Sequence, residues 1–180
     1  ADKLLEGLDD VDYFESIKKR QRNWIGRKEG AVITYPVENS EQEIKCFTTR
    51  PDTNFGATFI VLAPEHDFSQ QIAKNNKKVD KYINDALKKS ELERKEEGLE
   101  KTGVFTGEYA INQLNGNRLP IWISDFVLYD YGTGAVVGVP GHDIRDFDFA
   151  LKFDLKVIRV IRDNDGNIGE IKTREDVFEG

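Results

Sequence analysis

Hydrophobic and polar residues along the chain form blocks that are typical of β-strands. Early blocks rich in Val, Ile, Thr and Phe end at Pro or at polar turns, as strands do. They cover residues 31–37, 43–49 and 57–63. Strand-like blocks return further along, with Asn115-Gly116-Asn117 as a hairpin-type turn, and cover 108–111, 118–124, 126–129, 135–139 and 156–162. The pattern predicts a core made mostly of strands.

Helical spacing of apolar residues occurs in three places. Residues 12–24 predict a short helix, because Asp12 and Glu15 have capping-box spacing at the start of an apolar stripe. Residues 67–97 lack Gly and Pro, are rich in Lys and Glu, and predict one or two surface helices. Asp143 can cap a third helix, whose neighbours at helical spacing are Asp146, Phe147, Ala150 and Leu151. We therefore expect an α+β protein, mainly β, with peripheral helices.

Composition is that of a single globular domain. The 180 residues are 38% hydrophobic and include eleven Phe, enough to bury a core. No apolar run approaches about 18 residues and the N-terminus lacks a signal-peptide pattern, so we expect a soluble, intracellular protein. The single cysteine, Cys46, lies among β-prone residues, where a buried and inert thiol is expected. The absence of Met, even at position 1, predicts a piece excised from a longer protein.

Net charge limits the range of functions. A formal charge of −7 argues against general binding of nucleic acid, which depends on neutralising phosphates with Lys and Arg. Basic residues cluster at 18–22 and recur between positions 74 and 89. Solvated helix faces and local contacts with nucleic acid both account for such runs, and the sequence leaves the two open.

Several motifs for bound groups fail. The run Gly132–Gly138 spells G-x-G-x-x-x-G and precedes a β-prone stretch, so it is neither a dinucleotide fingerprint nor a Walker loop. It predicts a structural bend or a close backbone approach to a ligand. Asp163-Asn164-Asp165-Gly166 lacks the outer carboxylates of a calcium loop and predicts a hairpin turn, and the two histidines lack zinc-ligand spacing. With no G-x-S-x-G elbow either, we expect no metal, no cofactor and no covalent nucleophile.

Two polar segments carry the candidate chemistry. The first, Thr48-Thr49-Arg50-Pro51-Asp52-Thr53-Asn54-Phe55-Gly56, gathers hydroxyls, a guanidinium and a carboxylate at a rigid corner. The second places Asp143 and Asp146 one helical turn apart. A turn locked by an Arg50–Asp52 salt bridge and a capped helix would explain both without function. The alternative is a shared polar pocket for a small cationic ligand, in which one aspartate caps and the other faces the ligand.

As strings, Thr-Thr-Arg-Pro-Asp-Thr-x-Phe-Gly-Ala-Thr at 48–58 and Gly-Thr-Gly-Ala-Val-x-x-Val-Pro-Gly-His-Asp-x-Arg-Asp-Phe at 132–147 resemble segments of the leucyl-tRNA synthetase editing domain. The resemblance is of bacterial type, includes segments 23–30, 101–107 and 119–123, and covers nearly the whole chain. The family's adenylate-forming signatures are absent, so we expect ATP binding and aminoacylation only of the full-length synthetase.

The resemblance implies a β-barrel-like core decorated by helices. It implies one editing domain over 1–180, with a lead-in helix and segment at 1–28, a core at 29–162 and an exit segment at 163–180. The implied function is post-transfer editing, in which the ester of mischarged tRNA(Leu) is hydrolysed and leucyl-tRNA is spared. The implied partners are the 3′-terminal adenosine of that tRNA and the remainder of the synthetase, without a membrane. A cytoplasmic monomer is expected.

Roles for single residues also follow from the resemblance. Asp146 resembles the aspartate that holds the α-ammonium of the substrate, and Thr53 the residue that clashes with the branched γ-carbon of leucine. Thr48, Thr49 and Arg50 would line the wall near the reacting ester, with Thr49 and Arg50 assigned to catalysis beside Asp146. The remaining expected substrate contacts are Tyr131, Val137, Val139, Gly141, His142 and Asp143.

Two rival functions remain open. A non-catalytic tRNA-docking module would use the basic patches and keep the pocket as a vestige. A generic adenine-nucleotide-binding domain would bind nucleotides with an affinity that is indifferent to an attached amino acid. Deacylation of mischarged against correctly charged tRNA discriminates editing from docking, and adenine-nucleotide affinity with and without an attached amino acid identifies the generic domain.

Overall fold

A computed structural model of the chain describes residues 2–26, 29–90, 93–94, 101–129, 132–162, 166 and 169–179. The chain divides into two compact units, Ala1–Gly30 and Ala31–Gly180. The predicted boundary between a lead-in segment and a core, at residues 28 and 29, lies close to this division.

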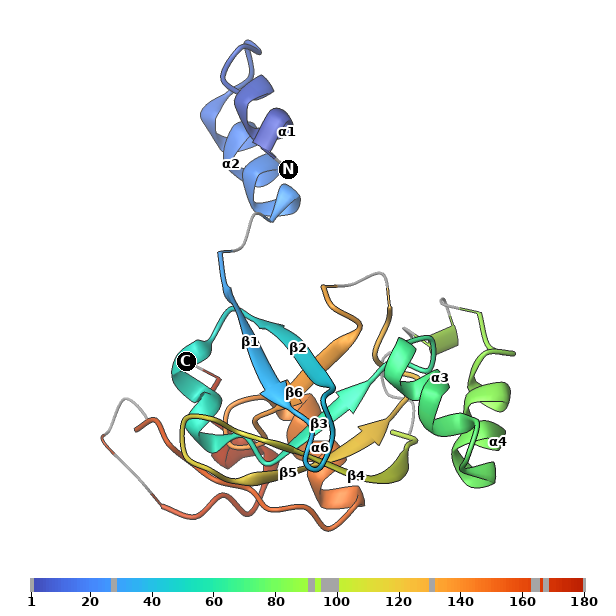
Figure 1. Cartoon of the computed structure of the whole chain (residues 1–180). Coiled ribbons are helices and arrows are strands. Elements are labelled where there is room, and N and C mark those ends of the chain that lie inside the picture. The colour runs from blue at the N-terminus through green and yellow to red at the C-terminus, as the bar shows by residue number, and fades with distance from the viewer. Residues whose placement is uncertain are drawn as a thin grey trace. The chain divides into compact units, whose positions relative to one another are not determined.

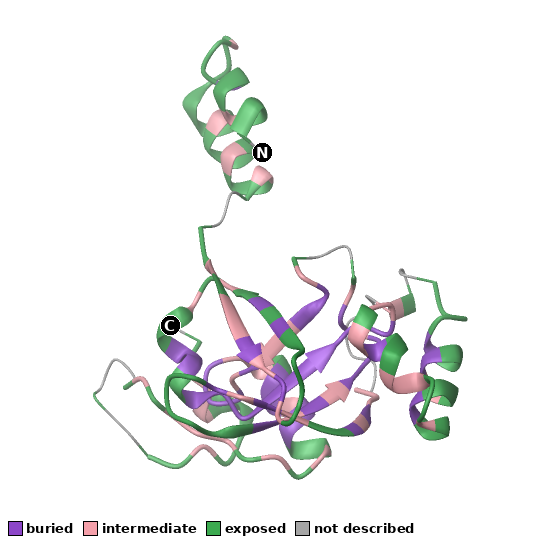
Figure 2. Cartoon of the chain, viewed as in Figure 1, coloured by how far each residue is buried: buried purple, intermediate pink, exposed green. Residues whose placement is uncertain are grey.

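The first unit contains two helices, α1 (Asp2–Gly7) and α2 (Glu15–Ile25). The predicted helix over 12–24 is therefore present, but Asp12 does not cap it: the N-cap is Phe14, which makes no side-chain capping bond. The helix ends where Gly26 adopts a left-handed conformation and its N–H donates to the Arg22 carbonyl, a common use of glycine. Leu8 is the one buried hydrophobic residue among those described in this unit, which is mostly exposed in Figure 2.

The second unit is built on two sheets (Figure 1). The smaller sheet pairs β1 with β2 antiparallel. The larger sheet has the order β4-β5-β3-β6. In it, β3 and β5 are parallel, whereas the pairs β3–β6 and β4–β5 are antiparallel. The strands are β1 (Ala31–Pro36), β2 (Glu43–Thr48), β3 (Phe59–Leu62), β4 (Val104–Ile111), β5 (Arg118–Ile123) and β6 (Ala135–Gly138).

Helices cover the larger sheet. Strand β3 is buried along its whole length, and successive side chains of a strand face opposite ways. Ile60 and Leu62 belong to one apolar cluster with Val79 and Ile83, whereas Phe59 and Val61 belong to a second. The helical elements are α3 (Asp67–Ala73), α4 (Lys77–Ala86), α6 (Ile144–Lys152) and the short 3₁₀ helices η1 (Pro51–Gly56) and η2 (Arg174–Asp176).

The second cluster seats α6 on the sheet. Phe149 stacks on Phe59 with ring centroids 5.1 Å apart, and Trp122 and Phe153 surround it. Aromatic contacts of this kind add about 0.5–1.5 kcal/mol each beyond their buried area. The helix that carries Asp146 is therefore held firmly against the core.

The predicted α+β class is confirmed, and two predicted strands are absent. Residues 126–129 form a turn and 156–162 no regular strand, although both were expected to be strands. The described strands form two separate sheets and do not close into a barrel. The predicted hairpin turn at 163–166 falls mostly on residues outside those described.

Two single features complete the description of the fold. Cys46 is fully buried in β2, and burial raises the pKa of its thiol to about 12, so it is an inert core residue. In the part of the chain that the structure describes, no helix combines the length and the apolar character needed to cross a membrane.

Candidate functional site

A cavity of about 620 Å³ opens where the two polar segments of the sequence meet. Segments far apart in the chain form its walls, so it exists only in the folded unit. The lining residues are Phe47, Thr48, Thr49, Arg50, Thr53, Arg94, Lys101, Phe126, Val127, Leu128, Val136, Val137, Val139, His142, Asp143, Arg145 and Asp146.

The threonine-rich wall follows the end of β2. The Thr48 hydroxyl accepts a hydrogen bond from the Arg50 N–H at 3.0 Å, and the Thr53 hydroxyl donates to the Arg50 carbonyl at 2.8 Å. Thr53 is 2% exposed, so its rotamer is fixed both by this bond and by packing. Thr49 is exposed, and within the described residues its hydroxyl bonds to no protein group. Thr49 is therefore the threonine whose hydroxyl is available to a ligand.

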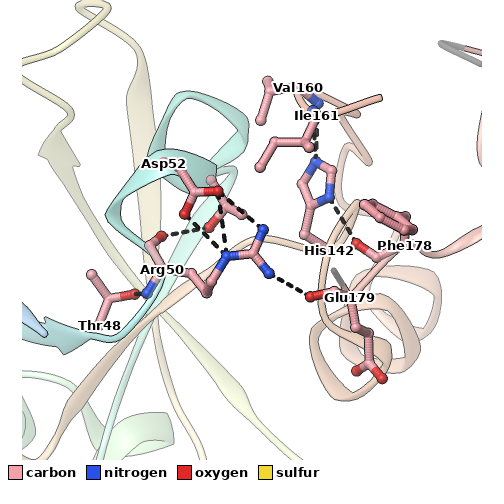
Figure 3. Close-up of polar contacts among 9 residues, drawn as sticks. Thr48, Arg50, Asp52, His142, Val160, Ile161, Phe178 and Glu179 are labelled. Carbon is pink, nitrogen blue, oxygen red and sulfur yellow. Dashed lines mark hydrogen bonds and ion pairs between the residues drawn. The ribbon is translucent and has the colours of Figure 1, made fainter. Parts of the chain in front are cut away.

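Arg50 has its guanidinium occupied by protein groups (Figure 3). Nη2 pairs with the Asp52 carboxylate at 3.0 Å, and Nη1 donates to the Glu179 carbonyl at 2.5 Å. The bond from Arg50 holds the pKa of the Asp52 carboxyl below its usual value. The Arg50–Asp52 salt bridge, which was the explanation of this turn without function, is thus present, and Arg50 also bonds to the C-terminal segment.

The opposite wall begins at α6. Asp143 is the N-cap, and its carboxylate accepts from the backbone N–H groups of Arg145 at 2.8 Å and Asp146 at 3.2 Å. Asp146 is 9% exposed and accepts a hydrogen bond from the Val139 N–H at 2.8 Å. The sequence left open whether one aspartate caps the helix while the other faces a ligand. In the structure Asp143 caps the helix, and Asp146 lies buried at the cavity.

The Asp146 carboxyl has a strongly perturbed affinity for protons. Burial, with a smaller contribution from the nearby Asp143 carboxylate, raises its pKa to about 7. The Val139 N–H opposes this shift only in part. A buried carboxylate of this kind is stabilised by an ion pair with a ligand cation, which would replace the water it has lost.

His142 and Gly141 lie in the segment that leads to α6. His142 lines the cavity, is 5% exposed, and bonds through both ring nitrogens to protein backbone (Figure 3). Gly141 is not among the lining residues: a Cβ there would lie 2.2 Å from the Ile158 carbonyl oxygen. Glycine is thus required by close packing of the two backbones.

The cavity brings together nine of the eleven residues predicted from the sequence: Asp146, Thr49, Arg50, Thr48, Thr53, Val137, Val139, His142 and Asp143. Gly141 packs behind them, and Tyr131 lies outside the described residues. Their individual roles stay predictions.

Sequence reasoning missed one side of the cavity. Lys101 lies with its ammonium 4.9 Å from the centroid of the Phe126 ring. Arg94 is buried and binds the Glu65 carboxylate at 2.5 Å and the carbonyls of Asp125 and Val127. Lys101 begins the segment 101–107 that carries part of the family resemblance, and Arg145 adjoins Asp146 in the aspartate motif, so both could have been found. No local pattern marks Arg94.

The described residues hold no group of three or more His, Cys, Asp or Glu side chains placed to bind a metal ion. The polar groups that the cavity does offer are a buried carboxyl at Asp146, a hydroxyl at Thr49 and the ammonium of Lys101. With the apolar residues Val137 and Val139, they can bind a small cationic and partly apolar ligand.

Comparisons with known proteins identify the family of the chain. The profile of a family described as "Leucyl-tRNA synthetase, editing domain" matches residues 22–180. A crystal structure of the ternary complex of the Agrobacterium radiobacter K84 agnB2 leucyl-tRNA synthetase with tRNA and LeuAMS is also similar, with 40% sequence identity and a TM-score of 0.73. That match covers 97% of this chain and 21% of the synthetase chain. The chain therefore belongs to the leucyl-tRNA synthetase editing-domain family.

Proposed function

We propose that this domain hydrolyses the aminoacyl ester of tRNA(Leu) charged with an amino acid other than leucine, and spares leucyl-tRNA. The observation that carries the proposal is that a buried carboxyl, Asp146, and a buried, rotamer-fixed threonine, Thr53, line one cavity. The carboxylate can hold the α-ammonium that every aminoacyl ester carries. The threonine can then test the shape of the amino-acid side chain.

The chemistry requires positioning more than activation. An aminoacyl ester is already labile, so holding it beside a water molecule and stabilising the oxyanion accelerates its hydrolysis. Water adds to the ester carbonyl, the C–O bond to the ribose breaks, and the ribose oxygen takes up a proton. The Thr49 hydroxyl is the proposed donor toward the oxyanion, since no described protein group occupies it. Arg50 was predicted to be catalytic. Because its guanidinium binds the Asp52 carboxylate and the Glu179 carbonyl, we propose that it positions the threonine-rich wall instead.

The adenosine would lie against the glycine-rich segment that precedes β6. Gly132 and Gly134 have positive φ angles of 67° and 68°, which turns the backbone there in a way that favours glycine. We place Asp143 toward the ribose and adenine, and Val137 and Val139 around the amino-acid side chain. We further propose tRNA(Leu) and the remainder of a leucyl-tRNA synthetase as partners of a cytoplasmic, monomeric protein.

A single-turnover assay tests the proposal. Deacylation of isoleucyl-tRNA(Leu) is expected to be much faster than its uncatalysed hydrolysis. Deacylation of leucyl-tRNA(Leu) is expected to proceed at the uncatalysed rate. A docking module would bind both tRNAs and accelerate neither. A generic adenine-nucleotide-binding domain would bind AMP as tightly as an aminoacyl-adenosine analogue.

The pH dependence of ligand binding follows from Asp146. Because the pKa of its carboxyl is raised to about 7, a proton must leave before an ammonium can pair with the carboxylate. Affinity is expected to rise with pH through about 7, then to fall above the pKa of the ligand amine, about 7.7–8.0 for an ordinary α-amino group. Calorimetry with 3′-isoleucylamido-3′-deoxyadenosine, a non-hydrolysable amide, measures this profile.

The matching amide without an α-amine is the control. It has no charge to offer Asp146, so its affinity should not rise between pH 6 and pH 7.5. A flat profile for the amine-bearing compound over that range would show that Asp146 is not its anchor.

A further inference from the structure

The last described residues of the chain contact both walls of the cavity. We define residues Asp176–Glu179 as the C-terminal strap. The Phe178 carbonyl lies 3.0 Å from Nδ1 of His142, and the Glu179 carbonyl accepts a hydrogen bond from Arg50 (Figure 3). The Glu179 carboxylate accepts from the Ile144 N–H at 3.2 Å. One short segment is therefore bonded to the threonine-rich wall and to the start of α6.

His142 is bonded both to the strap and to the segment that contains Val160 and Ile161, and these bonds define its tautomer. Its Nε2 accepts hydrogen bonds from the N–H groups of Val160 at 3.0 Å and Ile161 at 3.3 Å, so that nitrogen carries no proton. Nδ1 therefore carries the proton and donates to the Phe178 carbonyl. Burial lowers the pKa of His142, in agreement with a neutral ring. With both nitrogens occupied, the ring acts as a connection between backbone segments.

Arg50 links the strap to the threonine gate. Its side chain binds the Glu179 carbonyl, while its own carbonyl accepts both the N–H of Thr53 at 3.2 Å and the Thr53 hydroxyl at 2.8 Å. A displacement of the strap therefore acts on the residue that holds Thr53. The bond between Asp52 and Arg50 stiffens this connection.

Ile144 links the strap to the anchor. It is the first residue of α6, and Asp146 follows in the same turn. The Glu179 carboxylate lies at the N-terminus of this helix, where a negative charge is favourable. The strap therefore contacts both elements that would bind the substrate, namely the wall that contains Thr53 and the helix that contains Asp146.

We propose that Phe178 and Glu179 are positioning residues, which set the separation of Thr53 from Asp146 and so the selectivity of the cavity. The proposal rests on the proposed function, because selectivity is defined by ester hydrolysis. A sieve that distinguishes side chains of similar size needs walls held within a fraction of an ångström, and a displacement of about 1 Å can cost on the order of 100-fold in rate. The strap contacts supply a direct connection between walls that come from distant parts of the chain.

Deletion of residues 178–180 tests this inference, because it removes both carbonyl acceptors and the Glu179 side chain. The ratio of leucyl-tRNA to isoleucyl-tRNA deacylation is expected to rise by about tenfold or more, since the gate moves relative to the anchor. Glu179→Ala keeps the full chain and removes only the bond to Ile144, so a rise of about two- to tenfold is expected. Glu175→Gln, a change of charge on exposed η2, is the control and should leave the ratio unaltered.

Amide hydrogen exchange provides a second readout that does not depend on activity. The deletion should accelerate exchange at Thr53 and Asp146 by about tenfold or more, while Ile121 in the centre of the larger sheet keeps its rate. Unchanged exchange at Thr53 and Asp146 would overturn the inference, as would an unchanged deacylation ratio. Parallel loss of both deacylation rates with faster exchange at Ile121 would show a purely structural role, and would also overturn it. A wild-type chain that deacylates neither tRNA refutes the proposed function. In that case amide hydrogen exchange alone tests whether the strap positions Thr53 and Asp146.

Discussion

Asp146→Ala is expected to lower the deacylation rate of isoleucyl-tRNA(Leu) by on the order of 10²–10³-fold. Removing one partner of a buried charge pair costs about 2–5 kcal/mol, and each 1.36 kcal/mol corresponds to a factor of ten. Asp146 is a buried carboxyl of the cavity, and the Val139 N–H offsets only part of the rise in its pKa that burial causes. The ammonium of the substrate would compensate the charge of the carboxylate. Single-turnover deacylation measures the loss.

Asp146→Asn separates loss of charge from loss of structure. The amide keeps the size of the carboxyl and an oxygen that can accept from the Val139 N–H, so the fold should persist while activity falls. Because the folded-state pKa is raised to about 7, the wild-type carboxyl costs stability as pH rises from about 4 through 7. The asparagine variant should lack that decline and be at least as stable as wild type at pH 8.

Asp148→Asn is the matched control on the same helix. Asp148 does not line the cavity, and it pairs with Arg174 at 3.3 Å. Activity close to wild type is expected, because a partly exposed ion pair contributes little to stability. Near-normal deacylation by Asp146→Ala would move the ammonium anchor elsewhere, with Asp143 as the next candidate.

Thr53→Ala is expected to convert the domain into an enzyme that also deacylates leucyl-tRNA(Leu). The Thr53 hydroxyl is bonded to the Arg50 carbonyl, so its β-branched side chain is held in one rotamer at the cavity. Shortening it makes room for the branched γ-carbon of leucine. Since recognition of one methyl group is worth about 1–3 kcal/mol, the leucyl-tRNA rate should rise about 10–100-fold.

Two further substitutions identify the part of Thr53 that acts. Thr53→Val keeps the branched shape without the hydroxyl and should still spare leucyl-tRNA. Thr53→Ser keeps the hydroxyl without the methyl and should admit leucine. If Thr53→Ala spares leucyl-tRNA while hydrolysing isoleucyl-tRNA at the normal rate, the sieve lies elsewhere, and Val137 and Val139 become the residues to test.

The elements were predictable where local pattern and tertiary packing agree. The strand predicted over 57–63 contains β3, and the capped helix predicted at Asp143 is α6. Residues 126–129 and 156–162 have the composition of strands but make no ladder. Val127 and Val157 instead pack against the cluster around Phe59 and Phe149, so burial alone accounts for their apolar character.

The candidate site shows the same division. The threonine-rich and aspartate segments were found because each carries its chemistry within a few adjacent residues. Lys101 and Phe126 were not predicted as site residues, because their place at the cavity depends on folding. Arg50 and His142 line the cavity, as the sequence predicted, and their side chains also bond to distant backbone. Nothing in a local pattern specifies such partners.

By itself, the sequence determined the α+β class and the two segments that hold Asp146 and Thr53. Caps, turns and strand alternation depend on neighbours within a few positions, and these can be seen in the chain. Folding brings the two segments to one cavity, buries Asp146 so that the pKa of its carboxyl rises, and bonds Arg50 to Glu179 across 129 positions. Desolvation and long-range hydrogen bonds arise when distant parts of the chain come together. The periodicity of hydrophobic and polar residues depends on near neighbours and does not predict them.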